Sequence, residues 1–259
     1  LIVYRILGYR KKVVRENLAI ALPHLSEKER KTVEQKFYHH FCDSVLEVIK
    51  TMNLSDKEMA KRFTFDNIEL VQEMEAKGKS IVLICAHYSN YEWLLVMNKY
   101  LTFKGFGIYK KLRNRYFDRM VRNIRGKFGG TLIDSKEAIH KMKENQDNGI
   151  LGYYGLVSDQ SPKIRRINHY TQFFGREIPV FTGAEYLAKK LDMNVMFVKG
   201  QKVKRGHYKA RFISLEKDPA SYPDYQITDE FLKLLEQQIL EAPEYYLWTH
   251  KRFKHQKTV

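Results

Sequence analysis

The sequence has very few cysteines. Cys42 and Cys85 are the only two in its 259 residues. A pair so far apart builds neither a disulfide framework nor a cysteine-based zinc site. Cys85 lies inside an apolar run, where cysteine usually serves as a small core residue and not as a nucleophile. This shortage of cysteine indicates a protein of a reducing compartment.

Long apolar runs are also missing. No stretch of 18 apolar residues occurs in the sequence, so none of it is expected to span a membrane. The apolar residues 1–4, followed by the basic residues 10–12, have two interpretations. They are either the end of a longer hydrophobic anchor with its basic flank or the start of an ordinary buried helix.

Acidic residues are scarce relative to basic ones. The chain has 30 Asp and Glu against 46 Lys and Arg, which gives a formal net charge of +16 at pH 7. Such a surplus favours a polyanionic partner: nucleic acid, an anionic membrane surface, a phosphorylated lipid or an acidic carrier protein. The alternative is a basic surface that is merely well solvated. The sequence has no P-loop, dinucleotide-binding glycine fingerprint, Gly-x-Ser-x-Gly elbow or metal-ligand cluster, so neither a metal nor a cofactor is expected.

The N-terminal part of the chain predicts two helices, over residues 8–22 and 26–52. Pro23 separates them, and a capping box that begins at Ser26 restarts the second. The second helix has an apolar stripe in which side chains recur every four residues, and we expect it to pack on the main body or on a membrane surface. The stripe consists of Val33, Phe37, Phe41, Val45 and Ile49.

The remainder alternates between short apolar strands and helices, which predicts an α/β fold. We expect a central, mostly parallel or mixed sheet flanked by helices, with the N-terminal helices added to it. The expected division is an N-terminal helical segment over 1–55 and an α/β domain over 56–259, integrated as one unit. The expected strands are 80–86, 105–109, 131–133, 150–154, 194–200 and 208–215. The expected helices are 67–77, 90–101, 115–127, 135–144, 181–191 and 228–241.

The most informative stretch follows the apolar run 81–86. His87 comes directly after it, then the polar residues Ser89 and Asn90, and Glu92 lies five positions after the histidine. Five positions do not place two side chains on one helical face. The two therefore meet only if His87 lies on a strand-to-helix turn and Glu92 about one turn into the helix. An imidazole at a strand end, oriented by a carboxylate, is typical of a general base; a structural histidine is the alternative.

A basic helix follows another strand end. Tyr109 and Lys110 close that strand, and the helix after them carries arginines spaced three and four residues apart, hence on one face. This face suits a phosphate or an acidic carrier protein, although an isolated charged face is more often simply solvated. The arginines are Arg115, Arg119, Arg122 and Arg125.

Other segments add weaker candidates. Asp159 and Gln160 follow a strand, where they bind a sugar hydroxyl, orient an arginine or merely make a turn. Residues 161–172 form a basic loop, and the small residues near the end of 173–183 permit close backbone approach at a helix start. The aromatic and basic residues of 242–254 suit a membrane interface.

Together these segments resemble the bacterial lipid A late acyltransferases, a branch of the lysophospholipid acyltransferase superfamily. The superfamily's His-x4-acid motif appears as His87 to Glu92, with Glu in place of the Asp of the glycerol-phosphate branch. The resemblance covers nearly the whole chain in order, because the other motifs of the branch are matched by residues 9–18, 159–160, 174–183 and 242–254.

The resemblance implies transfer of a fatty acyl group from acyl carrier protein, or from acyl-CoA, to a hydroxyl of a lipid acceptor. In the family the His deprotonates that hydroxyl, the acid orients and charges the His, and a basic group stabilises the oxyanion. His87 and Glu92 are thus the expected catalytic pair, Arg122 or Arg125 is the matching arginine, and Asp159 is expected to position an arginine or a sugar. The expected substrate-binding residues are Arg122, Arg125, Asp159, Gln160, Tyr109, Lys110, Ser89 and Asn90.

The resemblance also implies a setting. The expected partners are acyl carrier protein, an anionic lipid acceptor such as a lipid A precursor, and the cytoplasmic face of a bacterial inner membrane, but not nucleic acid. Family members usually carry an N-terminal membrane helix, which is expected upstream of Leu1. One alternative is an acyltransferase for lysophospholipid or another membrane lipid. A remote one is a non-catalytic, basic protein that binds membranes or nucleic acid, for which no helix-turn-helix or aromatic RNA-binding motif is present.

Overall fold

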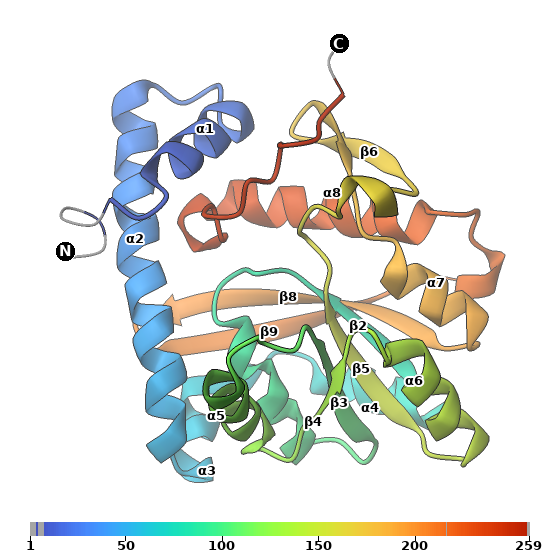
Figure 1. Cartoon of the computed structure of the whole chain (residues 1–259). Helices are drawn as coiled ribbons and strands as arrows, with labels where there is room; N and C mark the ends of the chain where they lie inside the picture. Colours follow the sequence, from blue (N-terminus) through green and yellow to red (C-terminus); the bar gives the residue numbers. More distant parts are fainter. Residues whose placement is uncertain (1–3, 5–7, 216, 258–259) are drawn as a thin grey trace.

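A seven-stranded sheet forms the centre of the molecule (Figure 1). The structure is a computed structural model that describes residues 4, 8–215 and 217–257. The strands of the sheet are β1 (Phe63–Phe65), β2 (Ile81–Cys85), β3 (Lys104–Tyr109), β4 (Thr131–Asp134), β5 (Gly152–Val157), β8 (Asn194–Lys204) and β9 (His207–Ser214). They lie in the order β1-β9-β8-β2-β5-β3-β4. Every neighbouring pair is parallel except β8 and β9. The predicted mostly parallel sheet of an α/β fold is confirmed.

Helices cover both faces of this sheet. They are α1 (Lys11–Ala21), α2 (Glu27–Lys50), α3 (Asp56–Arg62), α4 (Ile68–Ala76), α5 (Arg115–Gly126), α6 (Ala138–Asp147), α7 (Gly183–Lys190) and α8 (Gln226–Glu241). Short 3-10 helices are η2 (Thr51–Asn53), η3 (Tyr91–Lys99), η4 (Ile164–Arg166), η5 (Pro219–Ser221) and η6 (Pro243–Tyr245). In the described part of the chain, no helix is long and apolar enough to cross a bilayer.

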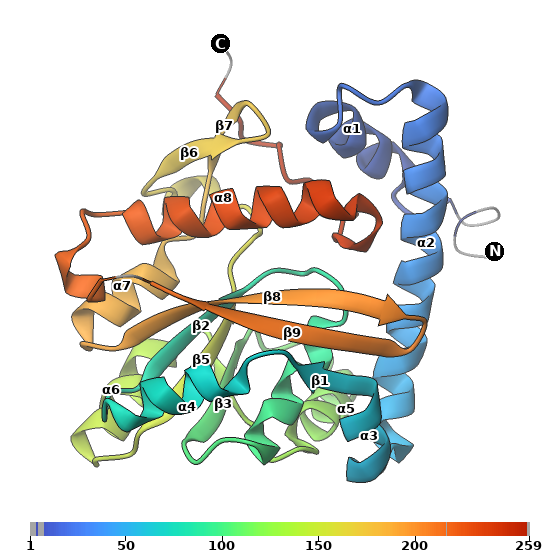
Figure 2. The ribbon, with the colours of Figure 1, turned by 180° about the vertical axis from the view of Figure 1, so that it is seen from behind.

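Strand β2 separates two hydrophobic cores. Because successive side chains of a strand point to opposite faces, Val82 and Ile84 face the core that contains α6, α7 and α8. Leu83 and Cys85 face the core that contains α3, α4 and η3. Views from the front and the back place α7 and α8 on one side of the sheet and α3 and α4 on the other (Figures 1 and 2). Burial raises the pKa of the Cys85 thiol far above its ordinary value, which agrees with a core residue and not a nucleophile.

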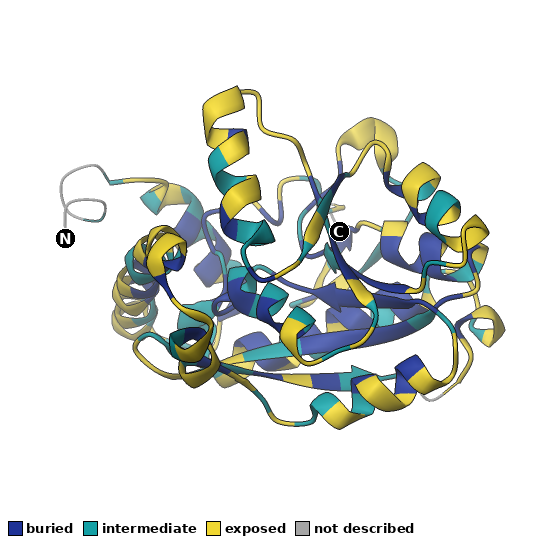
Figure 3. Ribbon diagram, turned by 90° about the horizontal axis from the view of Figure 1, so that it is seen from below, coloured by how far each residue is buried: buried dark blue, intermediate teal, exposed yellow. Residues whose placement is uncertain are grey.

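The long helix α2 runs beside the end of the β8–β9 pair (Figures 1 and 2). Its predicted capping box is present: Glu29 donates its backbone N–H to Ser26 Oγ, and Ser26 donates its backbone N–H to Glu29 Oε2. The apolar stripe of α2 divides into two parts. Phe37 is buried in the core, whereas Val45 and Ile49 lie exposed (Figure 3 shows buried residues dark blue and exposed ones yellow). Only the first part of the stripe packs on the described main body.

The helix α3 and the strand β1 were not predicted, and two further segments differ from the sequence-based prediction. The stretch after His87, predicted as a helix over 90–101, is the 3-10 helix η3. The basic loop predicted over 161–172 instead contains η4 and the strand β6 (Tyr170–Phe173), which pairs antiparallel with β7 (Arg176–Pro179). The turn between them has φ of 51° at Phe174 and 66° at Gly175. Two consecutive positive φ angles suit a tight hairpin. A phenylalanine is not a residue type from which such a turn is predicted, so the hairpin was missed.

Candidate active site

Two neighbouring strands bring a histidine and an aspartate together. His87 follows β2 and Asp159 follows β5, and these strands pair in parallel with Cys85 opposite Val157. The Ser158 N–H donates to the Cys85 carbonyl at 3.0 Å, which continues the ladder up to the two residues. Because the carboxyl ends of parallel strands lie at the same edge of a sheet, this edge is where α/β proteins place their sites.

Asp159 holds the imidazole of His87. Its Oδ1 lies 2.7 Å from Nδ1 of His87 and also accepts the His87 backbone N–H at 3.1 Å. Asp159 is 1% exposed, whereas the His87 side chain retains 18% of its surface. With Asp159 ionised, the proton on Nδ1 is shared with it, so Nε2 is the nitrogen with a lone pair to offer. The Gln160 amide nitrogen is 3.4 Å from that Nε2. This is the geometry of an oriented general base.

Burial and the neighbouring negative charges have opposite effects on the pKa of His87. Burial lowers its pKa, but the charge of Asp159 and their hydrogen bond, together with the charge of Glu92, outweigh burial and raise the pKa above its ordinary value. Burial raises the pKa of Asp159, but His87 and Arg252 outweigh burial there too, and the carboxyl remains below its ordinary value. Asp159 is therefore ionised at neutral pH and sustains the basicity of His87.

Glu92 does not contact His87, contrary to the prediction that it orients the imidazole. It instead forms a two-pronged ion pair with Arg125 of α5, with Nε to Oε2 at 2.7 Å and Nη2 to Oε1 at 2.6 Å. The reason lies in η3, which starts at Tyr91 and carries Glu92 toward α5. Tyr91 itself packs its ring edge-on against the imidazole, with 4.9 Å between ring centroids. Glu92 acts on His87 through its charge alone.

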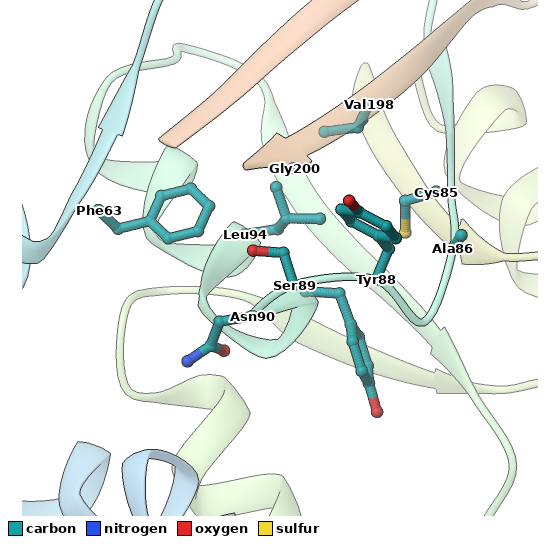
Figure 4. A pocket seen from close by; sticks show the side chains of 10 residues that line it. Phe63, Cys85, Ala86, Tyr88, Ser89, Asn90, Leu94, Val198 and Gly200 are labelled. Carbon is teal, nitrogen blue, oxygen red and sulfur yellow. The ribbon is translucent and has the colours of Figure 1, made fainter. Parts of the chain in front are cut away.

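The turn after His87 is fixed by distant residues. Ser89 has a φ of 58°, and its backbone N–H donates to the Tyr245 carbonyl at 2.9 Å. Asn90 donates Nδ2 to Glu47 of α2 at 2.8 Å. Below the turn lies a cavity of about 10 Å³, into which Ser89 points its hydroxyl between Phe63 and Leu94 (Figure 4). In the described residues this hydroxyl has no hydrogen-bond partner. Ser89 and Asn90, predicted to bind substrate, thus shape the turn instead of lining its open side.

The aromatic side chains of the C-terminal segment pack inside the protein, so the prediction that they lie at a membrane interface is wrong; Lys251 and Lys254 of the segment are exposed. Tyr246, Trp248 and Phe253 are buried, because the segment runs along the turn after His87 and pairs with it. The Leu247 N–H donates to the His87 carbonyl at 3.0 Å, and Tyr88 forms an isolated antiparallel bridge with Tyr246. The aromatic side chains complete the core beneath the site.

Arg252 is a residue of the site that the sequence did not single out. Arg252 is 1% exposed, and its guanidinium donates Nη1 to Ser161 Oγ at 2.9 Å and to the Pro179 carbonyl at 3.0 Å. Its charge also contributes to the low pKa of Asp159. His250 accepts the Ser161 N–H on Nε2, and burial lowers its pKa to about 4, so it stays neutral there. Together they fix the loop that follows Asp159.

The N-terminal motif meets this C-terminal segment. Arg10 donates Nη1 to the Thr249 carbonyl at 3.0 Å. Asn17 donates Nδ2 to the carbonyls of Trp248 and His250 at 2.8 and 2.7 Å. Two segments that lie at opposite ends of the sequence therefore form one structural support behind the site.

The remaining predicted residues lie along α5 and the end of β3. Arg122 donates Nη1 to the hydroxyl of Tyr109 at 3.2 Å. Lys110 is exposed and, among the described residues, makes neither a hydrogen bond nor an ion pair. Arg115 and Arg119 are exposed on α5. The structure thus groups His87, Asp159 and Gln160, places the Glu92–Arg125 pair beside them, and leaves Lys110 outside these contacts.

Known proteins resemble this chain over nearly its whole length. The family model "Bacterial lipid A biosynthesis acyltransferase" matches residues 2–255. The chain belongs to this family. It is 24% identical to the lipid A biosynthesis lauroyltransferase of Escherichia coli K12 over 253 residues, which are 96% of this chain and 81% of the relative. It is also 24% identical to a lipid A biosynthesis acyltransferase of Haemophilus influenzae over 241 residues, 90% of this chain and 72% of the relative.

A third relative has a different acyl specificity in its name. The lipid A biosynthesis palmitoleoyltransferase of Escherichia coli K12 is 21% identical over 260 residues, 95% of this chain and 79% of the relative. The resemblance found in the sequence is confirmed, and the chain is an acyltransferase of the lipid A biosynthesis family. Because its relatives are named for different acyl groups, membership in the family does not determine which acyl chain this protein transfers.

Proposed function

We propose that this acyltransferase moves a fatty acyl group from the thioester of acyl carrier protein to a hydroxyl of a lipid A precursor. The observation that carries the proposal is the orientation of His87, whose Nδ1 is held by buried Asp159 while Nε2 keeps its lone pair. A base oriented in this way suits activation of a hydroxyl. Membership in the lipid A acyltransferase family supports the choice of acceptor.

In the proposed mechanism His87 Nε2 takes the proton of the acceptor hydroxyl. The oxygen attacks the thioester carbonyl carbon, and the carbonyl oxygen becomes an oxyanion. When the tetrahedral intermediate collapses, the carbon–sulfur bond breaks, and the proton on His87 passes to the departing thiolate. Asp159 stabilises the imidazolium that exists between these two proton transfers. The net result is an ester and a free thiol, with the enzyme unchanged.

The Glu92–Arg125 pair has a separate role in this proposal. Glu92 occupies Nε and Nη2 of Arg125 and leaves Nη1 for a substrate anion. Arg125 is the family arginine that we assign to the oxyanion or to an acceptor phosphate, in preference to Arg122, which bonds Tyr109. A guanidinium fixed by a partner carboxylate stabilises developing charge without reorganising.

The net charge of +16 supports an anionic setting. Acyl carrier protein is acidic, lipid A precursors carry phosphates, and the cytoplasmic leaflet of a bacterial inner membrane is anionic. We place the enzyme at that membrane surface. Lys110, exposed directly after β3, and Arg122 are the cations that we assign to the acidic carrier protein, whereas Arg125 is assigned to the oxyanion or the acceptor phosphate.

The experiment that tests this function offers the purified protein an acyl carrier thioester and a panel of acceptors, and identifies products by mass spectrometry. The panel contains a lipid A precursor, a lysophospholipid and another phosphorylated glycolipid, and acyl-CoA replaces the carrier thioester in a parallel series. We expect an ester of the lipid A precursor from the carrier thioester. Acylation of the lysophospholipid alone would assign the enzyme to membrane phospholipid synthesis, and no product with any acceptor would refute the proposed function.

A further inference from the structure

The outward side of α2 carries an apolar surface that the described chain does not cover. Val45, Leu46, Ile49 and Met52 have between 46% and 62% of their surface exposed. Their spacing of one, three and three residues places them on one side of α2 and its continuation η2. Large aliphatic side chains gathered in this way are a mark of an interaction site, whereas single ones are ordinary on a protein surface.

The start of α5 and the residues just before it also carry exposed apolar side chains, and here cations lie among them. Leu112, Tyr116 and Phe117 are exposed, and Tyr116 retains 75% of its surface. The exposed arginines at positions 113, 115 and 119 alternate with them. Aromatic rings among cations suit the interface of an anionic bilayer, where the rings enter the headgroup layer and the cations meet lipid phosphates.

The acidic residues of both segments are turned inward. Residues 44–53 and 111–122 contain one acid each, Glu47 and Asp118, and both are buried. Asp118 accepts the backbone N–H of Leu112 at 2.9 Å, so its carboxylate is turned toward the backbone and away from the surface. The exposed sides are therefore apolar and cationic, and they complement an anionic lipid surface.

The same two helices hold the turn that contains the proposed general base. On its inward side α2 binds Asn90 through Glu47, and α5 binds Glu92 through Arg125. The two helices meet at the C-terminal end of α5, where Lys127 donates to the Thr51 and Met52 carbonyls. Figures 1 and 2 both show α5 beside the end of α2 that leads into η2.

We infer that the outward sides of residues 45–52 and 112–119 form one docking face for an anionic lipid bilayer. The inference rests on the proposed function, because a bilayer would present the lipid acceptor to the site that these helices support. An acidic carrier protein is the rival occupant of so basic a surface. Recognition of an acidic protein depends on ion pairs. Residues 45–52 instead present four half-exposed apolar side chains and one cation, Lys50, which favours lipid as the occupant.

The test is sedimentation of the whole protein with vesicles of pure phosphatidylcholine and of phosphatidylcholine with phosphatidylglycerol. Three variants are compared with the unsubstituted protein: Leu46→Ser with Ile49→Ser, Tyr116→Ser with Phe117→Ser, and the control Tyr186→Ser. Tyr186 is 52% exposed on α7, outside both segments of the proposed face. Circular dichroism and thermal melting establish that each variant is folded, which we expect because every substituted side chain is exposed.

We expect the unsubstituted protein and Tyr186→Ser to bind the anionic vesicles much better than the neutral ones. Each double substitution should weaken that binding about tenfold or more, since it removes two apolar side chains from the contact. Equal binding by all proteins would overturn the docking face. Binding of the same variants to immobilised acyl carrier protein is measured in parallel. Normal vesicle binding combined with lost binding to the carrier would overturn the docking face too and assign the surface to the carrier. Acyl transfer to a detergent-dispersed acceptor, measured in parallel, tests the proposed function independently of the vesicles.

Discussion

Two carboxylates act on His87 in different ways. Asp159 touches the imidazole at 2.7 Å and fixes which nitrogen bears the proton. Both carboxylate oxygens of Glu92 accept hydrogen bonds from Arg125, and Glu92 affects the pKa of His87 only through its charge. Substituting either one therefore has a different expected result, and the difference tests the geometry.

Asp159→Asn should alter the pH dependence of the reaction. The charge of Asp159 raises the pKa of His87, and His87 must be neutral to accept a proton, so activity is lost as pH falls through that pKa. Without the carboxylate the His87 pKa drops, and the acid limb of the kcat/KM profile moves to lower pH. The plateau rate should also fall, by about 10²–10⁴-fold, because the favoured tautomer is lost. An acid limb that stays in place would show that Asp159 does not set the basicity of His87.

Glu92 and Arg125 should behave as one unit. Glu92→Gln, Arg125→Gln and the double variant form a cycle in kcat/KM. Each single substitution is expected to cost about 10²-fold, because the guanidinium is either removed or no longer held. The double variant should lose far less than the product of the two single losses, since residues in contact are not additive. Losses that multiply would mean that the two side chains act independently, and would contradict a joint role of the ion pair in catalysis.

At the scale of elements, α2 joins a surface to the site. Its buried Glu47 accepts hydrogen bonds from Asn90 and from the hydroxyl of Tyr208, the latter at 2.8 Å. A carboxylate that satisfies two buried partners is costly to remove, because both donors lose their acceptor. The helix therefore stabilises the fold and the turn after His87 through one side chain.

Glu47→Ala should lower both stability and activity, whereas Ser26→Ala should lower stability alone. We expect Glu47→Ala to reduce the free energy of unfolding by about 1–3 kcal/mol and to reduce turnover, since Asn90 is released. Ser26→Ala removes the cap of the same helix, far from the site, and should cost about 1 kcal/mol. Urea unfolding and steady-state kinetics measure both effects. Turnover that falls equally in the two variants would show that α2 acts only through general stability.

Much of the element pattern was predictable from local sequence. A continuous apolar run predicts β2, which is buried on both faces, and a capping box predicts where α2 begins, because both depend on neighbouring residues. The β6–β7 hairpin was missed because its turn places Phe174 at a positive φ, which its residue type does not favour. The three-residue strand β1 is too short to show any period.

Apart from Arg252, the residues of the site were predictable from the sequence, but which of them pair with one another was not. His87 and Asp159 each follow an apolar run, which identified both as strand-end residues. That β2 lies directly beside β5 is a property of the strand order, which one sequence without contacts does not reveal. The choice between Glu92 and Asp159 as partner of the imidazole, and the burial of Arg252, both follow from that order and from the folding back of the C-terminal segment.

At the scale of the whole molecule, the surplus of positive charge should govern encounter with anionic substrates. The rate constant kcat/KM for an acyl carrier thioester should fall about tenfold or more between low and high ionic strength, because salt screens the attraction. A neutral acyl thioester of pantetheine with a soluble acceptor serves as the control and should respond little. Equal salt sensitivity of the two donors would show that the basic surface does not steer the carrier protein.

The central claim is that His87 is the general base of acyl transfer. The most direct measurement compares the rate of ester formation by His87→Ala with that of His140→Ala, which removes an exposed histidine of α6. Both use acyl carrier thioester and a lipid A precursor, and thermal melting shows that both variants are folded. The structure predicts a loss of about 10²–10⁴-fold for His87→Ala and a normal rate for His140→Ala. A folded His87→Ala protein that forms ester at nearly the normal rate would contradict the claim.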